Sequence, residues 1–386
     1  MKFNVTDSIE YIGVNDRTID LFESQYVVPN GISYNSYVIK DEKIAVMDTV
    51  DSRATNEWLE NVESSLEGKC PDYLVVSHLE PDHSGNIQNL AEKYPEMKII
   101  VNQKEADMMK QFSDVDLSER FVIVKEADVV DIGSHKLQFF MAPMVHWPEV
   151  MVTYEQTEKV LFTADGFGKF GTLDTEEDWA CEARRYYFNI VGKYGMQVQM
   201  LLKKVANLDV KIICPLHGPV LKENLEYYIN KYDIWSSYRP EDEGVLVAYN
   251  SIHGNTAKAI EKLEEILKEN GAKKVVVSDL ARSDIAEVIE DAFRYDKMIV
   301  ASPTYDAGLF PMTELFLREL KGKNYQNRKV GIIENGTWAP IAAKQMRDIL
   351  SEMKNVEICE NIVSIKTRMT EENEEQMRNM VKELLS

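Results

Sequence analysis

From residue 244 to the C-terminus, short apolar strands and helices alternate strictly, and this alternation limits the fold more than any other feature of the sequence. Five β–α units in about 140 residues predict a parallel, doubly wound sheet covered by helices. The expected strands are 245–249, 274–278, 297–301, 329–333 and 362–365, and the expected helices are 255–269, 285–293, 312–320, 340–353 and 371–385.

The polar segment 236–244 (Ser-Ser-Tyr-Arg-Pro-Glu-Asp-Glu-Gly) has no periodicity and is typical of a domain boundary. Before it, short strands mix with helices, including an expected hairpin over 32–39 and 43–48 and a long helix over 183–206. This pattern indicates two sheets packed face to face and covered on both sides. We therefore predict two α/β domains, 1–243 and 244–386: a four-layered αββα sandwich followed by a doubly wound five-stranded sheet.

Charge and cysteine usage exclude several classes of function. Lys and Arg number 44 against 65 Asp and Glu, so the net charge is −21, which repels nucleic acid and anionic lipid. No apolar run approaches the roughly 20 residues of a membrane span, and the N-terminus lacks the apolar stretch of a secretory signal. The four cysteines are far apart and form no CxxC, which argues against disulfides and favours the reducing cytoplasm.

Four candidate metal ligands follow the expected strand 73–77, in residues 77–86 (Ser-His-Leu-Glu-Pro-Asp-His-Ser-Gly-Asn). His78 and Glu80 lie two positions apart in an extended turn, so both can face one ion. Asp82 and His83 lie beyond the proline bend, where they can serve a second ion. A solvated polar loop is the alternative, but so dense a cluster after an apolar strand favours a metal site.

Three further candidates, His146, Asp165 and His217, each follow another expected strand. Each alone could be an ordinary strand end or a buried polar residue, but ligands beyond neighbouring strands can converge in one crevice. Seven ligands are too many for one ion and suit two ions with a shared bridge. Imidazole and carboxylate without thiolate suit iron and are less typical of zinc. His135, in a Gly-Ser-His-Lys turn, is predicted to have no role.

Three loops of the second half predict a mononucleotide site. The loop 251–256 opens a helix and offers backbone N–H groups to a phosphate, although an ordinary helix start is the alternative. The sequence has neither GxGxxG nor GxxxxGK[ST], which argues against dinucleotides and nucleoside triphosphates. Two later loops each carry an aromatic residue that can flank a flat ring at the expected switch point. The candidate residues are Ser251, Ile252, His253, Gly254, Asn255, Thr256, Ser302, Pro303, Thr304, Tyr305, Asp306, Gly308, Asn335, Gly336, Thr337 and Trp338.

The HxExDH motif, followed by a lone His, a lone Asp and a lone His at this spacing, resembles the metallo-β-lactamase-like domain of the flavodiiron proteins (A-type flavoproteins). Hydrolases of that superfamily have HxHxDH and usually hold zinc, whereas Glu80 replaces the second histidine here. The resemblance implies a first iron on His78, Glu80, His146 and Asp165, and a second on Asp82, His83, Asp165 and His217, with Asp165 bridging. It also makes Tyr194 a candidate neighbour of the site, whereas Trp147 is expected to serve packing.

The loop 251–256 resembles the FMN phosphate loop of flavodoxin, with His253 where Thr or Tyr is common. The 335–338 loop (Asn-Gly-Thr-Trp) varies the family's GxxGW-like pattern. A flavodoxin-like domain after the metal domain is the family's arrangement, and the absence of an appended rubredoxin or flavin-reductase module resembles its minimal class.

The resemblance implies an oxidoreductase that passes electrons from a protein donor through FMN to the diiron site. There dioxygen would be reduced to water or nitric oxide to nitrous oxide, in a head-to-tail homodimer or a dimer of dimers. The choice of gas and the donor (rubredoxin, another flavoprotein or a reduced deazaflavin) stay open. A binuclear zinc hydrolase with an accessory flavin domain is the alternative, which Glu80 disfavours, and an electron carrier with a structural metal is a third reading.

Overall fold

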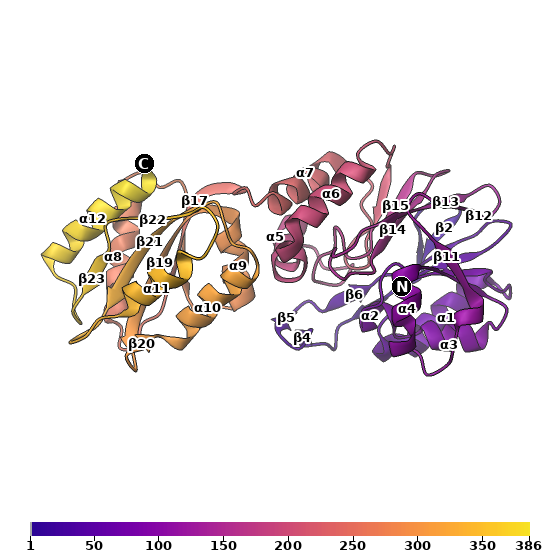
Figure 1. Ribbon diagram of the computed structural model, residues 1–386, viewed down its shortest axis with the longest axis horizontal. Helices are drawn as coiled ribbons and strands as arrows, with labels where there is room; N and C mark the ends of the chain where they lie inside the picture. Colours follow the sequence, from indigo (N-terminus) through magenta and orange to yellow (C-terminus); the bar gives the residue numbers. More distant parts are fainter. Residues whose placement is uncertain (1) are drawn as a thin grey trace. The chain divides into compact units, whose positions relative to one another are not determined.

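The computed structural model describes residues 2–386, which divide into two compact units (Figure 1). The first unit comprises the chain up to Tyr187 together with Met196–Asp233, and the second comprises Phe188–Gly195 together with Ile234–Ser386. The predicted domain limits at 243 and 244 remain a prediction. Within residues 2–386, every helix is too short or too polar to cross a membrane.

The first unit contains two main sheets whose inner faces share one core. Tyr37, Val75 and Ile100 of one sheet belong to the same buried cluster as Phe139 and Phe162 of the other, which confirms the face-to-face packing. The first sheet has the order β1 (Phe3–Asn4), β2 (Ile9–Tyr11), β7 (Tyr37–Ile39), β8 (Ala45–Met47), β9 (Tyr73–Val75), β10 (Lys98–Asn102) and β11 (Phe121–Val124). The second has the order β12 (Val129–Asp131), β13 (Lys136–Met141), β14 (Met151–Glu155), β15 (Val160–Phe162) and β16 (Ile212–Cys214).

Helices cover both outer faces, as the sequence predicts for an αββα sandwich. The helices α1 (Thr55–Leu66), α3 (Ile87–Lys93) and α4 (Gln103–Met108) lie on the side of the first sheet (Figure 1). On the other side, Val198 and Leu202 of α6 (Gly195–Val205) and Tyr232 of α7 (Leu225–Ser236) surround a small apolar void with Val152 and Leu161. Two short ribbons complete the unit, β3 (Val14–Asp16) with β6 (Ile32–Tyr34) and β4 (Leu21–Phe22) with β5 (Tyr26–Val27).

The single long helix predicted over 183–206 is wrong. The structure has α5 (Trp179–Tyr186), then a π-helical turn over Tyr187–Val191 and a 3-10 turn over Gly192–Tyr194 before α6. The Tyr238 hydroxyl donates to the Gly192 carbonyl at 2.7 Å and accepts from the Gly195 N–H at 3.1 Å. A Cβ at Gly195 would lie 2.4 Å from the Ser236 carbonyl oxygen, so only glycine allows this close approach.

The second unit confirms the doubly wound parallel sheet. Its order is β18 (Val275–Asp279), β17 (Asp242–Tyr249), β19 (Tyr295–Tyr305), β21 (Arg328–Asn335) and β22 (Val356–Ile358), all parallel to their neighbours. β23 (Val363–Ile365) also pairs with β21, so two short strands share the fifth position. This order is the flavodoxin-like 2-1-3-4-5, which leaves a switch point between β17 and β19.

Helices lie on both faces of this sheet (Figure 1). On one face, Leu263 of α8 (Asn255–Glu269) and Met380 of α12 (Glu371–Leu385) pack in one core with Val247, Ile299 and Ile333. On the other face lie α9 (Ile285–Arg294), α10 (Pro311–Gly322) and α11 (Ala342–Leu350). The loops after β17, β19 and β21 therefore meet at the carboxyl edge of the sheet.

Candidate functional site

The predicted metal ligands all lie in the first unit, just beyond strand ends. His78 follows β9, and Pro81 begins the short helix α2 (Pro81–Ser84), which carries Asp82 and His83. A proline at the first helical position fixes the turn at no hydrogen-bond cost, so Glu80 and Asp82 are held on either side of it. His146 lies between β13 and β14, Asp165 follows β15, and His217 follows β16.

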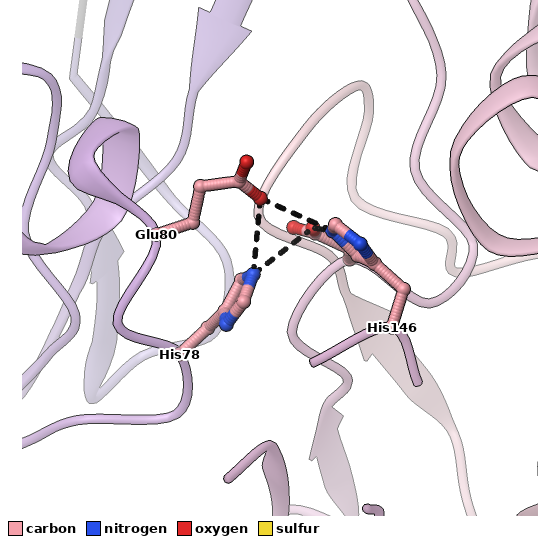
Figure 2. Close-up of side chains that lie close together, drawn as sticks. His78, Glu80 and His146 are labelled. Atoms are coloured by element: carbon pink, nitrogen blue, oxygen red, sulfur yellow. Dashed lines mark hydrogen bonds and ion pairs between the residues drawn. The ribbon is translucent and has the colours of Figure 1, made fainter. Parts of the chain in front are cut away.

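The structure brings four of these side chains into one group. Figure 2 shows Glu80 and the imidazoles of His78 and His146 pointing toward one another. His146 Nε2 lies 2.9 Å from Asp165 Oδ2 and 3.1 Å from Glu80 Oε2, and His78 Nε2 lies 3.2 Å from Glu80 Oε2. The ligand atoms of all four lie within 4.8 Å of one another, a spacing that fits coordination of one ion.

A second group joins the first through Asp165. His83 Nε2 lies 3.4 Å from Asp82 Oδ2, and His217 Nε2 lies 3.3 Å from the same oxygen. His83 Nε2 is also 3.1 Å from Asp165 Oδ1, whereas Asp165 Oδ2 faces the first group. Asp165 thus presents one oxygen to each group, as a bridging carboxylate does.

Several buried atoms of the second group have no hydrogen-bond partner among residues 2–386. These are both carboxylate oxygens of Asp82, both ring nitrogens of His83, and Asp165 Oδ1. A buried polar atom without a partner costs about 1–3 kcal/mol, so such a concentration calls for an additional group. Cations would satisfy the carboxylate oxygens and His83 Nε2, which faces them, and a set of imidazoles and carboxylates without thiolate suits iron. The residues therefore fit a binuclear iron centre.

The charges of the site also favour a cation. Burial lowers the pKa of His146, but hydrogen bonds to Asp165 and Glu80 outweigh it and raise that pKa to about 9. Burial raises the pKa of Glu80, but hydrogen bonds from His146 and His78 lower it to about 2. Glu80 therefore stays ionised and draws positive charge into the group.

Two of the imidazoles have hydrogen-bond partners on Nδ1, the ring nitrogen that points away from the site. His78 Nδ1 lies 2.8 Å from Glu149 Oε1, which also accepts the Leu79 N–H at 3.0 Å, and the ring's Nε2 faces the site. His217 Nδ1 lies 2.8 Å from the Ser33 carbonyl oxygen. Such partners fix the tautomer and the ring orientation of a metal-bound histidine. Glu149 was not predicted, although a carboxylate three positions after His146 is a signal that could have found it.

Aromatic rings enclose the centre. The Trp147 ring packs edge-on against His78 at 5.3 Å between centroids, which agrees with its predicted packing role. Phe22 of the β4–β5 hairpin and Tyr186 of α5 each lie 5.5 Å from the His217 ring. Neither was predicted, because nothing in their local sequence marks them. Tyr194 belongs to the segment that clusters with the second unit, and its role remains a prediction.

Thirteen of the sixteen predicted mononucleotide residues line one cavity of about 580 Å³ in the second unit. Its volume falls in the usual range for small-molecule sites. Three predicted residues, Gly254, Ser302 and Gly308, do not line it, and Ser302 is fully buried within β19. The predicted residues that line it are Ser251, Ile252, His253, Asn255, Thr256, Pro303, Thr304, Tyr305, Asp306, Asn335, Gly336, Thr337 and Trp338. Ala307, Ala339, Ile341 and Thr367 line it without having been predicted.

The local geometry of this cavity fits a phosphate and a flat ring. Ser251 Oγ accepts from the N–H groups of Gly254 and Ala257, and Gly254 has φ +86° at the start of α8, whose positive end faces the loop. Trp338 is 90% exposed and Tyr305 is 46% exposed at the rim. Large aromatic surfaces so exposed beside a cavity are typical of a site for a planar ligand. The residues fit FMN.

Comparisons with known proteins match the part of the chain that carries the metal ligands and the part that carries the cavity. Residues 32–218 match the ODP family beta lactamase model, and residues 246–385 match a flavodoxin domain model. An uncharacterized protein of Methanocaldococcus jannaschii is 32% identical over 82% of this chain and 81% of its own length. The anaerobic nitric oxide reductase flavorubredoxin of Vibrio vulnificus is 28% identical over 95% of this chain and 76% of its own length. The solved rubredoxin oxygen:oxidoreductase of Desulfovibrio gigas superposes with a TM-score of 0.92 at 25% identity, covering 100% of this chain and 98% of its own.

Proposed function

This chain belongs to the flavodiiron protein family, and from that premise we propose that it is an oxidoreductase that reduces dioxygen to water, nitric oxide to nitrous oxide, or both. Electrons pass from a protein donor through FMN in the second unit to a diiron centre in the first. The single observation that carries the proposal is the convergence of seven ligands in two groups that share Asp165.

We assign the first iron to His78, Glu80, His146 and Asp165, and the second to Asp82, His83, Asp165 and His217. The two groups and the unpartnered buried atoms support this assignment. Bound iron supplies Lewis acidity and redox equivalents to a small diatomic gas, and bound FMN supplies the electrons.

The side chains around the centre orient it and keep water out. Glu149 and the Ser33 carbonyl hold two imidazoles with Nε2 toward the centre, and Trp147 and Phe22 cover it with apolar surface. Burial raises the pKa of Tyr186 well above its ordinary value, so its hydroxyl keeps the proton. That hydroxyl has no hydrogen-bond partner among residues 2–386, and we propose that it donates a hydrogen bond to the bound gas.

The donor, the assembly and the compartment are finer points of the same proposal. We propose a rubredoxin-like donor that approaches the exposed rim of the cavity at Trp338 and Tyr305, since an electron carrier must come close to the flavin.

A head-to-tail homodimer, or a dimer of dimers, would bring the flavin of one chain near the metal centre of its partner. A monomer that retains full turnover in analytical ultracentrifugation and activity assays would contradict this assembly. Among residues 2–386 the four cysteines form no disulfide, which supports a reducing cytoplasm.

The first experiment is to purify the protein anaerobically and to measure iron, zinc and FMN per chain, together with gas consumption driven by reduced rubredoxin. We expect two irons and one FMN, in line with the two ligand groups and the single flavin cavity, and consumption of at least one gas. Two zincs with FMN and no gas consumption would instead support a binuclear hydrolase with an accessory flavin domain.

A further inference from the structure

A third group of metal-ligating side chains lies in the first unit, apart from the centre described above. It consists of His135, Glu155 and Glu158, hereafter the turn cluster, whose ligand atoms lie within 4.8 Å of one another. His135 lies in the β12–β13 turn, and the two glutamates lie at the end of β14 and in the turn that follows. His135 is in a turn, as predicted, yet it is only 5% exposed, and Glu155 is fully buried.

The carboxylates of the turn cluster are held in place by polar groups. Glu155 accepts the N–H of Thr157 at 2.6 Å and the N–H of Glu158 at 2.7 Å, one on each oxygen. One oxygen of Glu158 accepts from the hydroxyls of Thr6 and Ser8 in the β1–β2 turn. Within residues 2–386, neither glutamate has a Lys or Arg within ion-pair distance, and the imidazole of His135 lies beside both of them. Two carboxylates therefore share one imidazole in a largely buried place.

The imidazole and the carboxylate do not point at one another as a hydrogen-bonded pair does. His135 Nδ1 lies 3.0 Å from Glu155 Oε1, yet this buried nitrogen has no aligned hydrogen-bond partner. The metal centre shows the same arrangement, since His83 Nε2 is 3.1 Å from Asp165 Oδ1 and equally without an aligned partner. Two ligand atoms that each lie about 2.1 Å from one ion at a right angle are about 3 Å apart. Both pairs match that spacing.

We propose that the turn cluster binds a divalent metal ion of the manganese or zinc class, through His135 Nδ1 and one oxygen from each of Glu155 and Glu158. One imidazole and two carboxylates are ligands that both metals accept. The ion would offset the negative charges of the buried Glu155 and the half-buried Glu158. Glu158 also accepts hydrogen bonds from Thr6 and Ser8. The bound ion would therefore link the β1–β2 turn to the β12–β13 and β14–β15 turns. Its role is structural, apart from the redox centre.

Mn²⁺ is the probe that tests this site, because the electron paramagnetic resonance signal of free Mn²⁺ disappears on binding. The titration uses the oxidised protein with its iron and FMN in place and compares wild type with His135→Gln and Glu158→Gln. In Glu158→Gln the amide oxygen still accepts from Thr6 and Ser8, so the turn contacts survive. Glu96→Gln is the matched control, since Glu96 is exposed, lies in the same unit, and loses the same charge.

We expect wild type and Glu96→Gln to bind one Mn²⁺ per chain. The affinity should be at least ten-fold weaker in Glu158→Gln, and binding should be lost in His135→Gln. Iron and FMN contents should be the same in all four proteins, which shows that the variants fold. The site is refuted if wild type takes up no Mn²⁺, or if His135→Gln and Glu158→Gln bind it as wild type does.

Discussion

The metal centre and the flavin cavity are built in opposite ways. Six of the seven proposed ligands of the centre are buried just beyond strand ends, Glu80 is half-buried, and further contacts orient them, such as that of Glu149 with His78. The rim of the cavity, in contrast, exposes Trp338 almost completely. The centre is thus preorganised and sealed, whereas the cavity stays open to a cofactor and to a redox partner. The difference implies that changes at the centre abolish chemistry, while changes at the cavity weaken binding by graded amounts.

The largest effect is expected from Asp165→Ala, because this side chain faces both ligand groups. We expect loss of most of the iron and a fall in gas turnover of more than about 100-fold, since changes in residues that only hydrogen-bond to metal ligands already cost about 10–100-fold. Iron analysis and oxygen or nitric oxide electrodes measure the two effects, and FMN content should be unchanged. Asp114→Ala, which removes an exposed carboxylate of the same unit, should behave as wild type. Retention of both irons in Asp165→Ala would show that it is not a bridge.

A smaller effect is expected at Glu149, which contacts the metal ligand His78 and lies outside the ligand set. Glu149→Ala should weaken iron affinity by about 10–100-fold. The loss of iron affinity should be smaller in Glu149→Gln, because its amide oxygen can still accept hydrogen bonds from His78 Nδ1 and the Leu79 N–H. Competition with a chelator measures both affinities. Equal iron retention in wild type and Glu149→Ala would mean that the contact does not orient the imidazole.

At the cavity, Trp338→Ala should weaken FMN binding by about 3–10-fold, the effect of losing about 0.5–1.5 kcal/mol of ring stacking. Trp338→Phe keeps an aromatic face and should retain most of the affinity. Fluorescence titration of the flavin-free protein gives both constants, and iron content serves as the control. An unchanged constant in Trp338→Ala would place the flavin ring elsewhere in the cavity.

The smallest effect is expected from Gly254→Ala. A Cβ there would meet no atom within 4 Å, so only the backbone strain at φ +86° opposes it. That strain costs roughly 1 kcal/mol of the free energy of unfolding, which chemical denaturation of the second unit measures. A drop in FMN affinity larger than that at Trp338 would mean that the loop conformation itself decides phosphate binding.

The sequence predicted the features that depend on neighbouring residues, and it missed contacts between residues far apart in the chain. The seven candidate ligands were predicted because each follows an apolar strand, and the structure brings their side chains into two neighbouring groups. Phe22 and Tyr186 reach His217 only because of how the β4–β5 hairpin and α5 pack, which no spacing encodes. The break in the expected 183–206 helix has the same origin, since Tyr238 is far away in sequence from the glycines that it contacts. Thr367 was not predicted because it follows the last strand of the sheet, whereas the predicted cavity loops follow the first, third and fourth strands of the second half.

Reoxidation of the reduced flavin shows whether electrons pass from the flavin to iron and on to the gas. Wild-type protein is loaded with iron, loaded with zinc or left without metal, reduced anaerobically, and mixed with nitric oxide or dioxygen in a stopped-flow spectrometer. We expect at least one gas to reoxidise the flavin much faster in the iron-loaded protein, with the zinc-loaded protein as slow as the metal-free one. Equal rates in all three with both gases would contradict a redox-active diiron centre.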